Sequence, residues 1–262
     1  QRPGKGFTPV QKLLDLSGLA WIGGDTFLTV HDAKYPDEDK RTRVSLIRLP
    51  KSLDGLQWKP LRLRFMERKS SDLESAARIP GTRDVLLVES GDDGSDYNRI
   101  YLARANQRSV RIVDDTEWPT FYSVFNVEAT AVARTNHGFL FIWAERAQGK
   151  SSTQIHWTDM RLKPFQIGRS GKVGEVTFEL PPELSDLYNR PLVGLDLAPD
   201  GVIYGVAAQD SDFDNGPWRS AIMRIGKLDG TAIELDDEPT LVGKVDGENF
   251  GGREEGFFLG SL

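Results

Sequence analysis

Hydrophobic residues in this chain come in short runs that alternate with polar residues, and glycine, asparagine and aspartate separate the runs. Runs of this kind with such boundaries are typical of β-strands. Apolar residues do not recur at a three- to four-residue spacing over long windows, so helices are not expected. Where two runs flank Asp-Gly or Gly-Gly, a hairpin is expected, because these residues accept the positive φ of tight turns. The pattern predicts an all-β protein.

A short phrase recurs along the chain, reading Asp-Leu-Ser-Gly-Leu-Ala from Asp15, Asp-Leu-Glu-Ser-Ala-Ala from Asp72 and Asn-Val-Glu-Ala-Thr-Ala from Asn126. A weaker copy begins at Pro191, and Glu255 opens a fifth. The third position is taken in turn by Ser17, Glu74, Glu128, Val193 and Glu255, at steps of 57, 54, 65 and 62 residues. A regular period slightly above 50 residues without helices is typical of a β-propeller.

Each full period contains four strand-like runs, and four antiparallel strands make one propeller blade. The predicted strands are 18–22, 26–31, 43–49 and 58–65; 73–79, 85–89, 99–103 and 110–113; 127–133, 139–144, 153–158 and 174–180; and 193–197, 202–207, 221–225 and 241–245. We therefore predict one domain, 1–262, with blades at about 15–70, 71–125, 126–190 and 191–250, and a partial blade 251–262 closed by 7–14. This arrangement is five-bladed, or six-bladed if the chain continues past Leu262.

Composition narrows the classes of partner. The 262 residues are 39% hydrophobic and 27% charged, as in folded domains. A net charge of −6 without a basic stripe gives no electrostatic support for nucleic-acid binding, and no apolar run is long enough for membrane insertion. Cysteine is absent, which excludes disulfides. The chain begins with Gln1, and removal of a secretory signal would make the protein secreted, periplasmic or luminal. We expect a monomer.

Propeller topology brings distant acidic residues together. The innermost strand of a blade runs away from one face and the second strand returns to it, so strand starts and returning ends share one mouth of the channel. Seven carboxylates are expected there: Asp32, Glu74, Glu89, Glu128, Glu145, Asp210 and Glu255. They cannot all stay ionised and unpaired, because like charges raise one another's pKa. Protonation, pairing with Arg78, Arg134 or Arg146, and a bound divalent cation all remain open.

These carboxylates favour calcium or magnesium over zinc, because their oxygen atoms are hard ligands. The loop with Asp210, Asp212 and Asp214 resembles the first half of a calcium loop, although its glycine comes one residue late and Ala221 replaces the closing glutamate. A solvated turn is the alternative interpretation. The predicted metal ligands are Asp210, Asp212, Asp214, Glu74 and Glu128, and no organic cofactor is implied.

Evidence for catalysis is confined to one pair of residues. His31 and Asp32 lie together at the predicted mouth, where His31 is a candidate general base, ligand or hydrogen-bonded structural residue. Ser17 replaces the repeated glutamate, but no Gly-x-Ser-x-Gly elbow or phosphate-binding glycine loop accompanies it.

The repeated phrase resembles that of the phytase-like or esterase-like β-propellers, and Glu74, Glu128 and Glu255 match its glutamate while Ser17 and Val193 depart from it. The resemblance implies calcium and hydrolysis of phosphoesters or esters. Two hypotheses follow. The first is a non-catalytic platform that binds a protein partner or small ligand at the mouth, with the aromatic loop 118–125 contributing; the alternative is a metal-dependent hydrolase.

Overall fold

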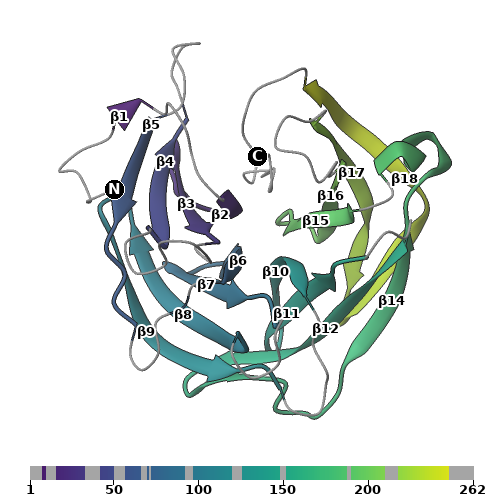
Figure 1. Ribbon diagram of the computed structural model, residues 1–262. Coiled ribbons are helices and arrows are strands. Elements are labelled where there is room, and N and C mark those ends of the chain that lie inside the picture. Colours follow the sequence, from purple (N-terminus) through teal and green to yellow (C-terminus); the bar gives the residue numbers. More distant parts are fainter. Residues whose placement is uncertain are drawn as a thin grey trace.

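The described residues of the chain form an all-β propeller of four antiparallel sheets arranged in an arc (Figure 1). The computed structural model describes residues 8–9, 16–32, 42–49, 57–65, 70, 72–91, 97–119, 126–147, 152–187, 190–209 and 218–247. Blade 1 contains β1 (Thr8–Pro9), β2 (Leu16–Gly23), β3 (Thr26–His31), β4 (Val44–Arg48) and β5 (Gln57–Leu61). Blade 2 contains β6 (Leu73–Arg78), β7 (Asp84–Glu89), β8 (Arg99–Asn106) and β9 (Ser109–Glu117).

Blades 3 and 4 repeat this plan with longer third strands. Blade 3 contains β10 (Val127–Thr135), β11 (Gly138–Glu145), β12 (Ser152–Leu162), β13 (Phe165–Ile167) and β14 (Gly174–Glu179), and both β13 and β14 pair with β12. A 3₁₀ helix, η2 (Pro182–Leu187), leads to blade 4, which contains β15 (Arg190–Leu197), β16 (Val202–Gln209), β17 (Trp218–Asp229) and β18 (Ala232–Gly247). The first strand of each blade, β2, β6, β10 or β15, is innermost.

The predicted blade number is wrong: the described residues form four blades, not five or six. The segment 7–14 was expected to close a fifth blade, yet its described part, β1, pairs with β5 at Trp58 and Gln57. It thereby adds an outermost strand to blade 1. The remaining part of the predicted fifth blade, 251–262, lies outside the described residues.

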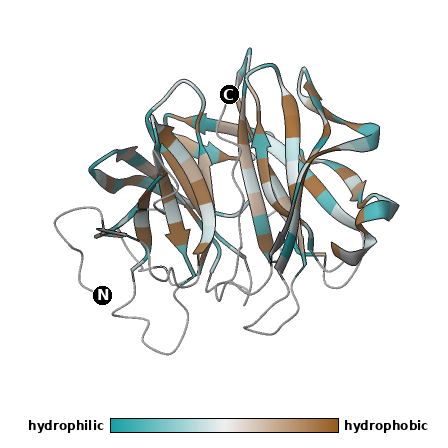
Figure 2. Ribbon diagram, turned by 90° about the horizontal axis from the view of Figure 1, so that it is seen from above, coloured by the Kyte–Doolittle hydropathy of each residue, from teal (hydrophilic) through white to brown (hydrophobic). Residues whose placement is uncertain are grey.

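The hydrophobic core lies between neighbouring blades, because the side chains of a strand alternate between its two faces. In β7, Leu87 packs toward blade 1, whereas Leu86 and Val88 pack toward blade 3. All six residues of β7 are therefore buried. Figure 2 shows hydrophobic residues concentrated along the strands of the four sheets.

An aromatic group fixes blade 2 against blade 3. Phe141 and Trp143 of β11 are buried, and Trp118 packs on them at ring-centroid distances of 5.4 and 5.6 Å. Its indole N–H donates to the carbonyl of Glu89, at 3.3 Å. Trp118 is thus part of the core and does not belong to an exposed binding loop, while 120–125 lie outside the described residues.

The fourth position of the repeated phrase is small in every copy, and at Gly18 the innermost strands of blades 1 and 2 approach closely. It is occupied by Gly18, Ser75, Ala129 and Gly194. A Cβ atom added to Gly18 would lie 2.8 Å from the backbone nitrogen of Ala76. Between blades 2 and 3, the hydroxyl oxygens of Ser75 and Thr130 are 2.8 Å apart.

This hydroxyl pair gives a test of the contact between blades. Ser75→Ala should lower the free energy of unfolding by about 1–2 kcal/mol, because the buried Thr130 hydroxyl loses its partner. Adding Thr130→Val should recover part of that loss, since no buried hydroxyl is then left unsatisfied. Urea denaturation of both variants measures the effect, and a Ser75→Ala variant as stable as the parent chain would contradict the described contact.

Candidate functional site

The strand-start mouth of the channel carries the acidic residues that the repeat predicts. We use this name for the end at which β6 and β10 begin and β3, β7 and β11 end. Glu74 and Glu128 occupy the starts of β6 and β10, while Glu89 and Glu145 end β7 and β11. Asp32 directly follows β3. Of the other predicted residues, Asp210, Asp212, Asp214 and Glu255 lie outside the described residues.

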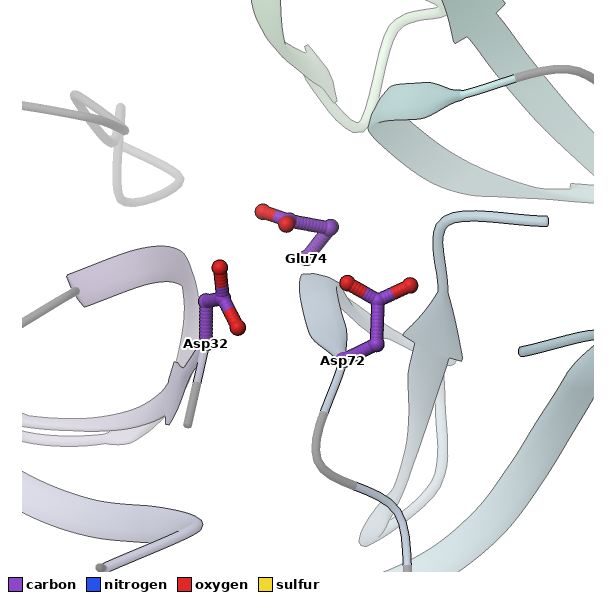
Figure 3. Close-up of side chains that lie close together, drawn as sticks. All are labelled: Asp32, Asp72 and Glu74. Carbon is purple, nitrogen blue, oxygen red and sulfur yellow. The ribbon is translucent and has the colours of Figure 1, made fainter. Parts of the chain in front are cut away.

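Three carboxylates converge at the junction of blades 1 and 2, and we call Asp32, Asp72 and Glu74 the carboxylate cluster. One oxygen from each residue lies within 4.8 Å of the others. Figure 3 shows the three side chains around a common space, with Asp32 from blade 1 facing the other two from blade 2. An isolated β-bridge joins Asp32 to Asp72, so the backbones of the two blades fix this arrangement.

Asp72 is the anchored member of the cluster. Its side chain is fully buried, and the hydroxyl of Ser90 donates a hydrogen bond to Oδ2. The backbone N–H of Asp72 lies 3.4 Å from the hydroxyl oxygen of Ser70. Asp32 and Glu74 are only partly buried. The cluster therefore has a buried, oriented side at Asp72 and a side that reaches solvent at the other two residues.

Sequence reasoning identified Asp32 and Glu74 but missed Asp72. The signal was present: Asp72 opens the second copy of the repeated phrase, two positions before Glu74. Asp72 precedes β6, and the pairing of β6 with β7 shifts register between Leu73 and Ser75, so simple strand alternation does not describe this pair. Our prediction considered only the third position of each copy, and the β-bridge between Asp32 and Asp72 has no local sequence pattern.

The other three described glutamates predicted at this mouth, Glu89, Glu128 and Glu145, lie apart from the carboxylate cluster. Glu89 is fully buried and accepts hydrogen bonds from the backbone N–H of Arg99, at 2.8 Å, and the Tyr101 hydroxyl, at 3.2 Å. Glu128 forms ion pairs with Arg146 at 3.6 Å and with the buried Arg190 at 3.4 Å. Glu145 is partly buried at the end of β11. None of the three belongs to the carboxylate cluster.

Two of the arginines expected to pair with these acids lie elsewhere. Arg78 ends β6, and Arg134 is the second-last residue of β10. A strand rises about 3.3 Å per residue, so Arg78 lies roughly 13 Å along β6 from Glu74. The expectation that Arg78 and Arg134 pair with the acidic residues of the strand-start mouth is therefore wrong. Of the three predicted arginines, Arg146 forms such a pair, with Glu128.

His31 is buried inside blade 1. Its Nε2 atom lies 2.8 Å from the hydroxyl oxygen of Ser45 on β4, and 4% of the residue is exposed. The neighbouring Asp32 is partly exposed at the mouth. A general base must reach its substrate. The geometry thus favours the hydrogen-bonded interpretation of His31 over a role as base.

Comparisons with known proteins give only distant structural likenesses. No family model matches the sequence, and no curated protein matches it. The GH32 β-fructofuranosidase BmSUC1 of Bombyx mori is 13% identical with a TM-score of 0.47, covering 92% of this chain and 52% of that one. Hydrazine synthase of Kuenenia stuttgartiensis is 11% identical with a TM-score of 0.39, and the match covers 80% of this chain and 51% of that one.

A GH43 glycoside hydrolase with an engineered active site is 12% identical with a TM-score of 0.39, covering 99% of this chain and 59% of that one. This chain spans about half the length of the first solved structures that it matches. At these levels the likeness carries no activity over, and the resemblance to phytase-like propellers stays a prediction. Within the described residues, no helix has the length and apolar character that crossing a membrane requires.

Proposed function

We propose that this chain is a non-catalytic β-propeller that binds calcium at the strand-start mouth and uses the loaded mouth as a binding platform. The observation that carries the proposal is the carboxylate cluster, in which Asp32, Asp72 and Glu74 bring oxygens within 4.8 Å of one another. Carboxylate oxygens are the ligands that Ca²⁺ prefers, and it takes six to eight of them, water included.

The surroundings of Asp72 support a cation site. The Ser90 hydroxyl orients one carboxylate oxygen of this buried residue. Hydrogen bonds of this kind hold metal ligands in place in known sites. Asp32 and Glu74 reach solvent, so a bound cation would keep positions open toward the channel. A carboxylate or hydroxyl group of a protein partner or small ligand can occupy those positions.

Calcium should raise the melting temperature of the chain. The cluster spans blades 1 and 2, so a cation bound there holds the folded arrangement together. Calcium at roughly 100 times its dissociation constant would add about 2.7 kcal/mol, or a rise of about 5–10 °C for a domain of this size. Differential scanning calorimetry in calcium, magnesium and EDTA measures the shift.

Matched variants locate the effect. Glu74→Gln and Asp72→Asn should abolish the calcium-dependent rise, whereas Glu179→Gln, an exposed glutamate on β14, should retain it. Glu74 is partly exposed, so its variant tests the site even if Asp72→Asn fails to fold. An equal rise in the parent chain and in Glu74→Gln, or no rise in either, would refute the calcium site.

Metal-dependent hydrolysis of phosphoesters or esters is the second candidate. The partial exposure of Asp32 and Glu74 favours it, because a cation held there can also bind and polarise a water molecule. Turnover of p-nitrophenyl phosphate or p-nitrophenyl acetate that requires calcium and is lost in Glu74→Gln would support the hydrolase. Calcium binding without turnover of either substrate would leave the platform as the function.

A further inference from the structure

The opposite end of the channel contains a cavity to which all four blades contribute. We call this end the turn-side mouth, because the innermost strands turn there into the second strands. The cavity has a volume of about 360 Å³. Its wall includes Trp21 of blade 1, Arg78 of blade 2, Arg134 of blade 3 and Asp196 of blade 4. Pockets of about 300–1,000 Å³ with apolar walls and a few polar groups are the usual size for small ligands.

Two guanidinium groups give this cavity a positive character. The guanidinium carbon of Arg78 lies 4.4 Å from the centroid of the Trp21 ring, a cation–π contact. An Nη atom of Arg134 lies over Gly81, where an added Cβ would be 2.7 Å away. The positive φ of Gly81, +74°, also disfavours any larger residue. The chain thus leaves space for the Arg134 guanidinium beside the cavity.

The guanidinium groups of Arg78 and Arg134 line the cavity, and exposed arginines such as Arg111 share their lack of a described ion pair. Neither forms an ion pair with a described carboxylate. Six other arginines do so: Arg48, Arg99, Arg104, Arg146, Arg190 and Arg224. Guanidinium groups without a protein carboxylate are suited to bind a carboxylate or phosphate of a ligand, since charge-assisted hydrogen bonds are the stronger kind.

Asp196 is the one acidic group on the described wall of the cavity. Its carboxylate accepts the backbone N–H of Leu197 at 2.9 Å, and burial raises the pKa of the carboxyl to about 7. Arg78 and Arg134 line the same cavity from β6 and β10. Within blade 4, Asp196 is paired in register with Tyr204 of β16, and Tyr204 is paired in turn with Arg224 of β17. Arg224 forms an ion pair with Asp236 at 3.1 Å.

We propose that the turn-side mouth binds a small organic anion with a compact apolar body. Arg134 and Arg78 would contact its carboxylate or phosphate group, and the apolar side chains of Val132, Leu197 and Leu228 would contact the body. Neutral Asp196 can donate a hydrogen bond to the anion, whereas its ionised form would repel it. The site is independent of the carboxylate cluster, so either can fail without the other.

Isothermal titration calorimetry of the full chain at about pH 6 tests the proposal with three probes. Benzoate and phenyl phosphate carry the two anionic groups, and benzamide has a similar body without charge. We expect at least one anion to bind at least tenfold more tightly than benzamide, because the guanidinium groups recognise charge. The preferred anion then separates a carboxylate from a phosphate ligand. Failure of both anions to bind at roughly 10 mM, or equal binding of benzamide, would overturn the proposal.

Variants assign the binding to named residues. Arg134→Gln and Arg78→Gln should each weaken anion binding about tenfold. Arg111→Gln, an exposed arginine on β9 away from the cavity, should bind as the parent chain does. Arg134 is exposed, so its variant stays informative if loss of the Arg78 contact with Trp21 disturbs folding. Parent-like binding in Arg134→Gln and Arg78→Gln would reject the assignment.

A pH series distinguishes this site from adventitious anion binding. Benzoate affinity should fall several-fold between about pH 6 and about pH 8, since Asp196 ionises in this interval and repels the ligand. Benzoate itself stays ionised throughout, because its carboxyl titrates at lower pH. Asp196→Asn should remove the pH dependence while retaining binding. An unchanged pH dependence in that variant would show that Asp196 does not face the anion.

Discussion

Replacing Asp196 with asparagine should stabilise the folded chain at about pH 8 and change its stability little at about pH 4. Burial raises the pKa of this carboxyl from 3.8 to about 7. Between these values the folded chain holds a proton that the unfolded chain has released. The stability of the parent chain therefore falls as pH rises from about 4 to about 7, and asparagine removes this dependence.

The expected gain at about pH 8 is roughly 2–4 kcal/mol, since each pKa unit corresponds to about 1.4 kcal/mol and the residue is only partly buried. The amide oxygen of asparagine can still accept the N–H of Leu197. Urea denaturation at both pH values measures the difference. Asp229→Asn, an exposed change in the same blade, serves as control. It should change the free energy of unfolding by the same small amount at both pH values. Parallel pH profiles of Asp196→Asn and the parent chain would contradict the prediction.

A destabilising acid beside a cavity fits a binding role. Buried carboxylates with displaced pKa values gather at functional sites, because the arrangement that a ligand needs is often unfavourable for the fold alone. Two innermost strands add to this picture: β6 runs from Glu74 to Arg78, and β10 from Glu128 to Arg134. Both strands thus place a glutamate at the strand-start mouth and an arginine at the turn-side mouth, while Arg146 and Arg190 pair with Glu128 at the former and Asp196 lines the latter.

The sequence predicts the hairpins well, because they depend on local signals. Gly24 and Gly201 adopt positive φ in the turns between first and second strands, as the Gly-Gly and Asp-Gly sequences predicted, and Gly81 and Gly138 do so in the other two hairpins. The outer strands were harder to predict. β18 covers Ala232–Gly247, whereas the sequence suggested only 241–245. Its first half carries a short alternation that the prediction missed, since Ile233 is buried and Leu235 packs on the core while Glu234 between them is exposed.

Blade number and the composition of the site depend on contacts between distant segments. No local pattern distinguishes a fifth blade from an extra strand on blade 1, which is the place that β1 occupies. The same applies to Asp72, which reaches Asp32 through a bridge between blades. Arg78 and Arg134 were placed at the wrong mouth because proximity in sequence was taken for proximity in space, although an extended strand separates its two ends.

Gly18→Val should be among the most destabilising single changes in the chain. A Cβ at this position would lie 2.8 Å from the nitrogen of Ala76 and 2.9 Å from the Cα of Ser75. Both are backbone atoms of β6, so no side-chain rotation relieves the overlap, and β2 must move away from β6. We expect a loss of about 3 kcal/mol or more, measured by urea denaturation without calcium.

Gly243→Val is the matched control, because nothing lies within 4 Å of a Cβ added at Gly243 in β18. Valine is favoured in strands, so this variant should be as stable as the parent chain or more so.

In Gly18→Val, the movement of β2 away from β6 would draw Asp32 away from Asp72 and Glu74. The β-bridge between the two blades holds these residues together in the parent chain. Folded Gly18→Val should therefore show a smaller calcium-dependent rise in melting temperature than Gly243→Val. Parent-like stability of Gly18→Val would mean that β2 and β6 are not in contact, and the carboxylate cluster would then lose its structural basis.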